Sequence, residues 1–351
     1  EASGDDASLA VGMYGLVAEH MFYGRMRQSF AAAAELIALL DRLADLDSSI
    51  GVAFLAIGAT SEAGDYRTVL RLADKVIDWA GGDPARGSLI TGSPLAIALL
   101  WRATARWSLG LGGWRDDLRD ATRMARAADA GTFAMVVGVK NATATQGVLI
   151  VDDDTAHEID EAVRGARSVG DDTALGSALF GGGTALMLHP DEAVRTRGRE
   201  MMDEFRRMCT DGRFFASELP AIESDIARGM ARLGDREAAL PILRRTVNTL
   251  FDIGQAVNTV IATGNLVVTL VELGGPDHLA EAQRAVDRMA TVPADEPFVV
   301  RDISVLRLRA LLAGARGDGE HPELVEAYRT MAESLGFEGH LAWAREMASD
   351  E

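Results

Sequence analysis

Short turns containing glycine recur along the 351-residue chain, and each is followed by the pattern of an amphipathic helix. Related segments begin at four glycines, with the sequences GRMRQSFAAAAELI (24–37), GDYRTVLRLADKVIDWA (64–80), GGWRDDLRDATRMA (112–125) and GDREAALPILRRTV (234–247). Glycine tolerates the backbone that ends one helix, and the polar residue after it can cap the next. Such recurrence predicts a repeat protein, in which each unit buries its apolar face only by stacking on its neighbours.

The turns predict eight helical hairpins, with an interval of about 40 residues and one longer step between the second and third turns. The turns fall at 23–26, 63–66, 111–114, 151–154, 189–192, 233–236, 273–277 and 315–323. The predicted first helices are 8–22, 49–62, 94–109, 133–149, 173–187, 217–232, 256–272 and 298–313. The predicted second helices are 26–45, 66–80, 115–129, 155–168, 191–209, 236–252, 278–290 and 321–334, and a ninth short helix covers 339–347.

Apolar residues recur at the helical period almost everywhere, and alternating strand patterns are scarce. Val69, Leu72 and Val76, for example, form one stripe of the segment that follows the turn at 63–66. We therefore expect an all-α fold, a right-handed superhelical solenoid of about eight hairpins. Residues 1–351 form one helical-repeat domain in this prediction, which we take to be a fragment of a larger multidomain protein.

Charge and composition exclude several classes of function. The formal net charge of −18 disfavours nucleic acid as a partner, because binding phosphates requires a basic face. The longest apolar runs are shorter than the roughly 18 residues that span a membrane, and no secretory signal is visible. We expect a cytoplasmic protein without a membrane partner. Cys209 is the sole cysteine, which excludes an intrachain disulfide and a cysteine-based zinc site.

No motif of an enzyme or a cofactor site stands out. The chain has no phosphate-binding G-x-x-x-x-G-K-[ST] loop, and His157-Glu158 lacks the second histidine of a zinc-protease motif. We therefore expect no catalysis by this region, no cofactor and no bound metal. Three consecutive glycines at 181–183 lie inside a predicted helix. Close helix packing or a kink explains them best, with ligand binding as the alternative.

The repeats resemble tetratricopeptide repeats, most clearly in ARGMARLGDREAALPILRRTV (227–247). Ala231, Leu233, Gly234, Ala238 and Ala239 stand where such a repeat has small or apolar residues. The period is nearer 40 than the usual 34 residues, which is similar to the longer helices of bacterial ATPase regulators related to the maltose activator. The resemblance implies that the first helices line the concave side of a superhelix.

A second resemblance is confined to the last part of the chain. The segments LRALLAGARGDG (308–319) and YRTMAESLGFEGHLAWAREM (328–347) resemble the C-terminus of actinobacterial multidomain class III adenylate/guanylate cyclases that also carry an ATPase domain. Similar tails occur in LuxR-type regulators. The resemblance implies a regulatory part of a signalling protein and leaves the attached catalytic or DNA-binding domain open.

Amide and hydroxyl side chains interrupt the apolar first helices. Asn258 and Asn265 are seven residues apart and share one face, and Asn141 and Thr145 do the same in the fourth unit. In peptide-binding relatives, asparagines at this place hold the backbone of a ligand. We weigh that role against hydrogen bonds between helices and simple solvent exposure.

A third candidate group lies on the first helix of the third unit, where Trp101 is followed by Arg102 and Arg106. Packing in the core is one interpretation of these residues, and a binding wall is the other, since Trp and Arg make rigid anchors.

The predicted function is a non-catalytic regulatory interaction module. A protein or peptide partner, or another domain of the same chain, would lie in the concave groove, alter its curvature and so bias attached cyclase or ATPase domains. The alternative is a small-molecule sensor with a pocket between first helices, near residues 181–183 and the asparagine-bearing helices.

Overall fold

The computed structural model describes residues 3–349, and over this range the secondary structure is entirely helical. The first half holds α1 (Ser3–Phe22), α2 (Met26–Leu40), α3 (Leu46–Glu62), α4 (Tyr66–Ala80), α5 (Pro94–Ser108), α6 (Trp114–Ala128), α7 (Ala130–Ala142), α8 (Asp153–Val169) and α9 (Asp172–Leu186). The second half holds α10 (Glu192–Thr210), a short 3-10 helix η1 (Ala216–Glu218), α11 (Leu219–Arg232), α12 (Arg236–Ile253), α13 (Ala256–Leu273), α14 (Pro276–Met289), α15 (Val299–Arg316), α16 (His321–Leu335) and α17 (Glu338–Ser349). The all-α prediction is confirmed.

The recurring glycine turns join helices as predicted. Gly64 has a φ of +84°, and the carboxylate of Asp65 accepts a hydrogen bond of 3.0 Å from the Thr68 amide, which caps α4. Tyr66 is fully buried at the start of that helix. The same combination, a glycine in the left-handed backbone conformation followed by an aspartate cap, occurs at Gly170 and Asp171 before α9.

Several predicted boundaries are wrong: α1 begins at Ser3 and not at residue 8, α2 ends at Leu40 and not at residue 45, and the largest error is at the end of α7. The helix expected over 133–149 ends at Ala142. In residues 143–147, each amide donates to the carbonyl three residues before it, so consecutive β-turns replace the helix. The hydroxyls of Thr143 and Thr145 bond back to the carbonyls of Lys140 and Ala142, which offers the backbone an alternative to the helix. Gly147 then takes a φ of +70° and ends the turn.

The three glycines at 181–183 serve helix packing. A Cβ at Gly181 would overlap the carbonyl oxygen of Gly138 on α7, so α7 and α9 approach as backbones in contact. A Cβ at Gly182 or Gly183 would press on Ile159 of α8 or Met202 of α10. The packing interpretation is therefore confirmed, and these glycines do not line the pocket that we considered near them.

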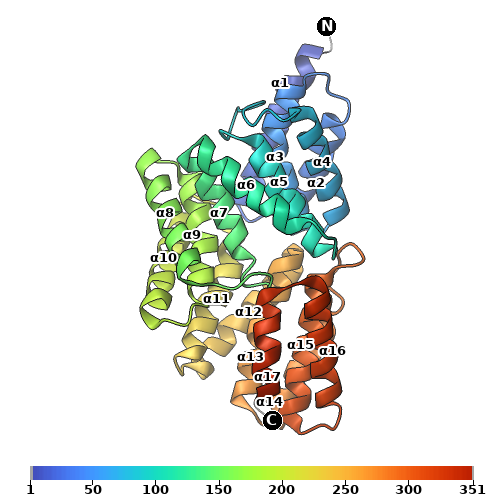
Figure 1. The fold of residues 1–351 in the computed structure, drawn as a ribbon, viewed down its shortest axis with the longest axis vertical. Helices are drawn as coiled ribbons and strands as arrows, with labels where there is room; N and C mark the ends of the chain where they lie inside the picture. The colour runs from blue at the N-terminus through green and yellow to red at the C-terminus, as the bar shows by residue number, and fades with distance from the viewer. Residues whose placement is uncertain (1–2, 350–351) are drawn as a thin grey trace.

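The stack of helices curves so that its C-terminal part returns to the region of α3 to α7. Figure 1 shows α1–α6 above, α7–α10 on the left and α13–α17 below, with the end of α5 and α6 returning to the C-terminal helices. The loop before α15 reaches the turn before α4, where the Asp295 amide donates to the Gly64 carbonyl at 3.0 Å and the Arg67 amide donates to the Asp295 carboxylate at 2.6 Å. We call these two hydrogen bonds, together with the second set described below, the closure contacts.

A second set of closure contacts joins the turn after α7 to the start of α17. The amides of Glu338 and His340 donate to the carbonyls of Val148 and Gly147, both at 3.0 Å. Arg115 on α6 also pairs with the Glu338 carboxylate at 3.0 Å. The closure contacts turn the concave side of the stack into an enclosed interior.

One helix within residues 3–349, α13, is long and apolar enough to cross a membrane by length and hydropathy. It packs between α11, α12, α14 and α15, and 56% of the apolar window is buried inside the fold.

Candidate functional site

The enclosed interior contains a cavity whose wall comes from the odd-numbered helices α1 to α13 and the segments that follow α7 and α10. We call it the apolar cavity. Its cavity volume is about 160 Å³. The helices of the predicted first set therefore face the interior, as the repeat architecture implies.

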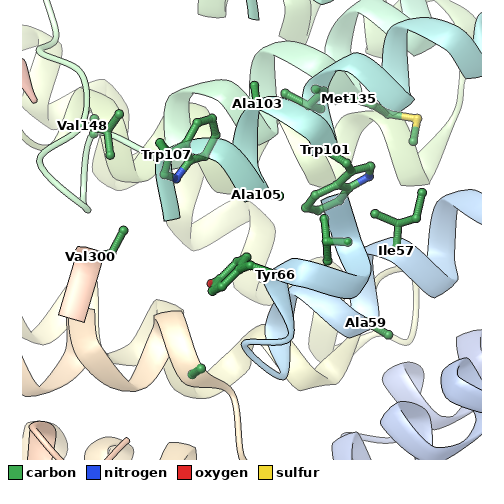
Figure 2. Packing of buried hydrophobic residues seen from close by; sticks show 14 of the residues in the cluster. Ile57, Ala59, Tyr66, Trp101, Ala103, Ala105, Trp107, Met135, Val148 and Val300 are labelled. Atoms are coloured by element: carbon green, nitrogen blue, oxygen red, sulfur yellow. The ribbon is translucent and has the colours of Figure 1, made fainter. Parts of the chain in front are cut away.

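Aromatic side chains dominate the wall of the apolar cavity. They come from α3, α5, α9 and the loop before η1, and they are Phe54, Trp101, Trp107, Phe180, Phe214 and Phe215. Figure 2 shows Trp101 and Trp107 on the same helix, α5. The Trp107 indole donates to the Gln146 side chain at 3.3 Å, whereas the buried indole nitrogen of Trp101 has no hydrogen-bond partner among the described residues.

Two carboxyl groups also line the apolar cavity, at the point where α3 and η1 approach α13. Asn258 donates to the Glu62 carboxylate at 3.2 Å, and Ser217 donates to the Glu218 carboxylate at 2.9 Å. Burial raises the pKa of Glu218 to about 7, and burial together with Glu218 raises the pKa of Glu62 well above its usual range. Neither carboxyl has an ion pair with a described cationic residue. Burial therefore favours the protonated form of both carboxyls.

A second cavity adjoins the first and shares Thr145, Gln146, Thr184, Asp225 and Ile261 with it. Its cavity volume is about 110 Å³. Three arginines line it, Arg228 and Arg232 from α11 and Arg307 from α15, so we call it the arginine cavity.

The three arginines differ in their partners. Arg228 makes two hydrogen bonds to the Glu272 carboxylate, at 2.6 and 2.9 Å. Arg232 donates to the Met187 carbonyl at 3.1 Å, a neutral acceptor. Arg307 lies over the Trp343 ring at 4.3 Å from its centroid, and its nitrogens have no hydrogen bond or ion pair within residues 3–349.

The pKa values of this group reflect crowding of positive charge. Desolvation and the neighbouring Arg228 lower the pKa of both Arg232 and Arg307. The nearest carboxyl in the wall, Asp225, accepts a hydrogen bond of 3.0 Å from Asn265, and burial raises its pKa to about 7. Glu346 on α17 raises the pKa of Arg307, against the effect of desolvation, and Glu272 and Asp225 do the same for Arg232. None of these three carboxylates makes a hydrogen bond to Arg232 or Arg307 within residues 3–349.

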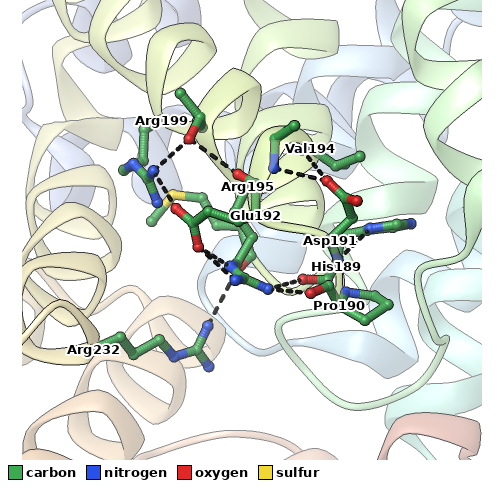
Figure 3. Close-up of polar contacts among 11 residues, drawn as sticks. His189, Pro190, Asp191, Glu192, Val194, Arg195, Arg199 and Arg232 are labelled. Carbon is green, nitrogen blue, oxygen red and sulfur yellow. Dashed lines mark hydrogen bonds and ion pairs between the residues drawn. The ribbon is translucent and has the colours of Figure 1, made fainter.

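An outer pocket meets the arginine cavity at Met187, Leu188, Gly229, Arg232 and Trp343. Figure 3 shows Arg232 extended toward the turn between α9 and α10 in this region. Arg195 on α10 donates to the carbonyls of His189 and Pro190 in the same turn, and it pairs with Glu192. The outer pocket joins the arginine cavity to the surface beside basic side chains.

Four of the predicted site residues lie in these walls. Asn258 and Trp101 line the apolar cavity, Asn265 lines the arginine cavity, and Thr145 lines both. Asn258 and Asn265 each donate to a side chain of another helix, so they also link helices, which was the alternative interpretation.

The other three predicted residues lie outside both walls. Asn141 is buried and donates to the Val137 carbonyl of its own helix at 2.8 Å. Arg102 and Arg106 both pair with the buried carboxylate of Asp117 on α6, at 2.7 and 2.6 Å, and Arg102 also reaches Asp74 at 3.3 Å. They tie α5 to its neighbours α6 and α4.

Sequence reasoning missed the ionisable residues of the interior, namely Glu62, Glu218, Asp225, Arg228, Arg232 and Arg307. Each lies on a first helix or in η1, the set that faces inward. A search for charged residues on the apolar faces of those helices would have found several of them.

No metal or redox chemistry is indicated by the side chains. Within residues 3–349, no group of three or more His, Cys, Asp or Glu side chains is placed to hold a metal ion. Cys209 is buried, and burial raises the pKa of its thiol to about 12. Comparison with known proteins gives no further guide, since no family model matches the chain and no curated protein is significantly similar to it.

Proposed function

We propose that the chain is a small-molecule-sensing module whose ligand lies in the apolar cavity. The observation that supports this choice most is the enclosure of the first-helix face. In an open solenoid, that face would offer a long groove to a peptide. Here the closure contacts join the C-terminal part of the stack to the region of α3 to α7 around it, and an apolar wall that includes aromatic side chains and a few polar groups is typical of small-molecule pockets.

The proposal includes the architecture expected from the repeats, a right-handed superhelix of about eight hairpins, and a non-catalytic role. It extends to a coupling with other domains. A ligand that binds one arrangement of the ring more tightly shifts the population toward it. Asn258 on α13 bonds Glu62 on α3, so the cavity wall spans both sides of the closure. Occupancy would alter these contacts and bias an attached domain, such as a cyclase or an ATPase in a cytoplasmic signalling protein.

A protein partner is the second candidate function that we retain from the repeat pattern. Its place would be the outer surface of the second helices, since the inner face is enclosed. The apolar cavity favours the small-molecule sensor over it.

The test uses N-phenyl-1-naphthylamine, a neutral dye that fluoresces in apolar sites, with a variant that fills the cavity. Ala142 lines the apolar cavity, so Ala142→Leu should reduce dye binding at least tenfold. Ala127 on α6 is exposed, and Ala127→Leu is the matched control that should bind like the parent protein. Equal dye binding by parent, variant and control would contradict a ligand site in the apolar cavity.

A further inference from the structure

The arginine cavity carries an inference that rests on the proposed function and specifies its ligand. Buried carboxyl groups can dispose of their charge by taking up a proton, as Glu62 and Glu218 are placed to do in the apolar cavity. A guanidinium cannot, because arginine stays protonated in proteins. A desolvated arginine whose donors are not hydrogen-bonded to a carboxylate therefore favours an anion from outside the chain.

Arg307 is such a residue. Its stem lies on α15, its guanidinium stacks on Trp343, and none of its nitrogens is hydrogen-bonded within residues 3–349. Stacking on an indole fixes the plane of a guanidinium and leaves the edge, with its hydrogen-bond donors, free for a planar acceptor. Arg228 and Arg232 line the same cavity, and the carboxylate of Glu272 is shared by Arg228 and Arg236. The other carboxyls near the arginines, Asp225 and Glu346, act on Arg232 and Arg307 through their charge only.

The position of the arginine cavity links it to the apolar cavity. Thr145, Gln146 and Thr184 belong to both walls and present hydroxyl and amide groups at the junction. One molecule could place an apolar body among the aromatic side chains and a charged head against the arginines. The outer pocket connects the arginine cavity to the surface between basic and acidic side chains, among them Arg232, Glu192 and Glu346.

We infer that the ligand is an amphipathic organic anion, whose carboxylate or phosphate head binds Arg307, Arg228 and Arg232 in the arginine cavity and whose apolar body fills the apolar cavity. Both head groups offer the coplanar pair of oxygens that a guanidinium binds through two hydrogen bonds. A cationic ligand held by Glu62 and Glu218 is the competing assignment, and it would leave Arg307 unbalanced.

The experiment compares four probes with eight-carbon chains by thermal unfolding: the neutral 1-octanol, the anions octanoate and monooctyl phosphate, and the cation n-octylamine. We expect octanoate or octyl phosphate to raise the melting temperature at concentrations at least tenfold below those of octanol or octylamine. The stronger of the two anions identifies the head group. Arg307→Met should abolish the advantage of the anions, and Arg307→Lys should restore part of it.

The matched control is Arg309→Met, on the same helix but exposed, and it should retain the full preference for anions. Equal effects of octanol and the anions, a preference for octylamine, equal losses in Arg307→Met and Arg309→Met, or no stabilisation by any probe would overturn the inference. The proposed function fails separately, through unchanged dye binding in Ala142→Leu. Dye binding lost there with no preference for anions would leave a sensor for a neutral or cationic ligand.

Discussion

Two clusters of arginine occupy comparable places in the fold and have opposite electrostatic balance. Arg102 and Arg106 on α5 converge on the buried carboxylate of Asp117, and Arg102 adds Asp74. Arg228, Arg232 and Arg307 line a cavity in which Glu272 pairs with Arg228, whereas Arg307 makes no hydrogen bond to a carboxylate within residues 3–349 and Glu346 acts on it only through its charge. The first cluster is complete and holds helices together. The second is incomplete, which is how a binding site for an anion differs from a structural ion pair.

The largest effect is expected from breaking the complete cluster. Asp117→Asn removes the charge that two arginines share in a site where the carboxylate is 6% exposed. Loss of one partner of a buried ion pair costs about 3–5 kcal/mol, and we expect a loss of this size in the free energy of unfolding. Urea denaturation at neutral pH measures it. Asp116→Asn, a neighbouring and largely exposed residue of α6, is the control, and a similar loss there would contradict the comparison.

A smaller effect on stability should come from Glu62 and Glu218, two carboxyl groups whose negative charge is removed by protonation and not by an ion pair. The folded pKa of Glu218 lies near 7, above its ordinary value, so the folded state binds a proton more tightly than the unfolded state. Its contribution to stability therefore falls as pH rises from about 4.5 to about 7. The fall should be about 1–3 kcal/mol, because a tenfold difference in proton affinity is worth about 1.4 kcal/mol. Asn258, Ser217 and Glu62 are the polar groups around it.

Glu218→Gln should remove this dependence, so the variant should gain stability relative to the parent protein at pH 8 and not at pH 4.5. Urea denaturation at both pH values provides the measurement. Glu237→Gln changes an exposed residue of α12 and is the control for a general effect of charge. A constant difference between Glu218→Gln and the parent protein at both pH values would show that proton uptake does not balance this site.

The smallest effect should come from Arg307, in the protein without ligand. Arg307→Met removes a guanidinium that has stacking on Trp343 but no hydrogen bond or ion pair in the described part of the chain, and methionine retains an apolar stem. We expect the free energy of unfolding to change by less than about 1 kcal/mol, in either direction. A loss as large as that of Asp117→Asn would show that Arg307 is structural and would erase the difference between the clusters.

The repeat pattern could be predicted because it depends on local rules. The glycine turn, the aspartate cap and the apolar stripe each act within one hairpin, and together they placed α4 over its observed range. The end of α7 was missed because the hydroxyls of Thr143 and Thr145 compete with the helix, a balance that also involves the contact of Gly147 with α17 far along the chain.

The candidate site could be predicted only in part, for a similar reason. Repeat periodicity identifies the inward helices, and so it indicated Asn258, Asn265 and Trp101. It could not separate Arg102 from Arg307, since both lie on first helices and the difference is the presence of Asp117 on the next helix. Whether an arginine is neutralised depends on tertiary distances, which no spacing in the sequence records.

The closure contacts also have a consequence for synthesis of the chain. The Arg67 amide bonds Asp295, 228 residues later. At translation rates of about 5–20 residues per second, the early helices wait roughly 10–45 s before their closing partner leaves the ribosome. During that delay the aromatic side chains of α3 and α5 lack the opposite wall of α13. A nascent chain of this architecture therefore exposes the apolar inner face of an incomplete ring. Its binding to chaperones should end once the loop before α15 has emerged.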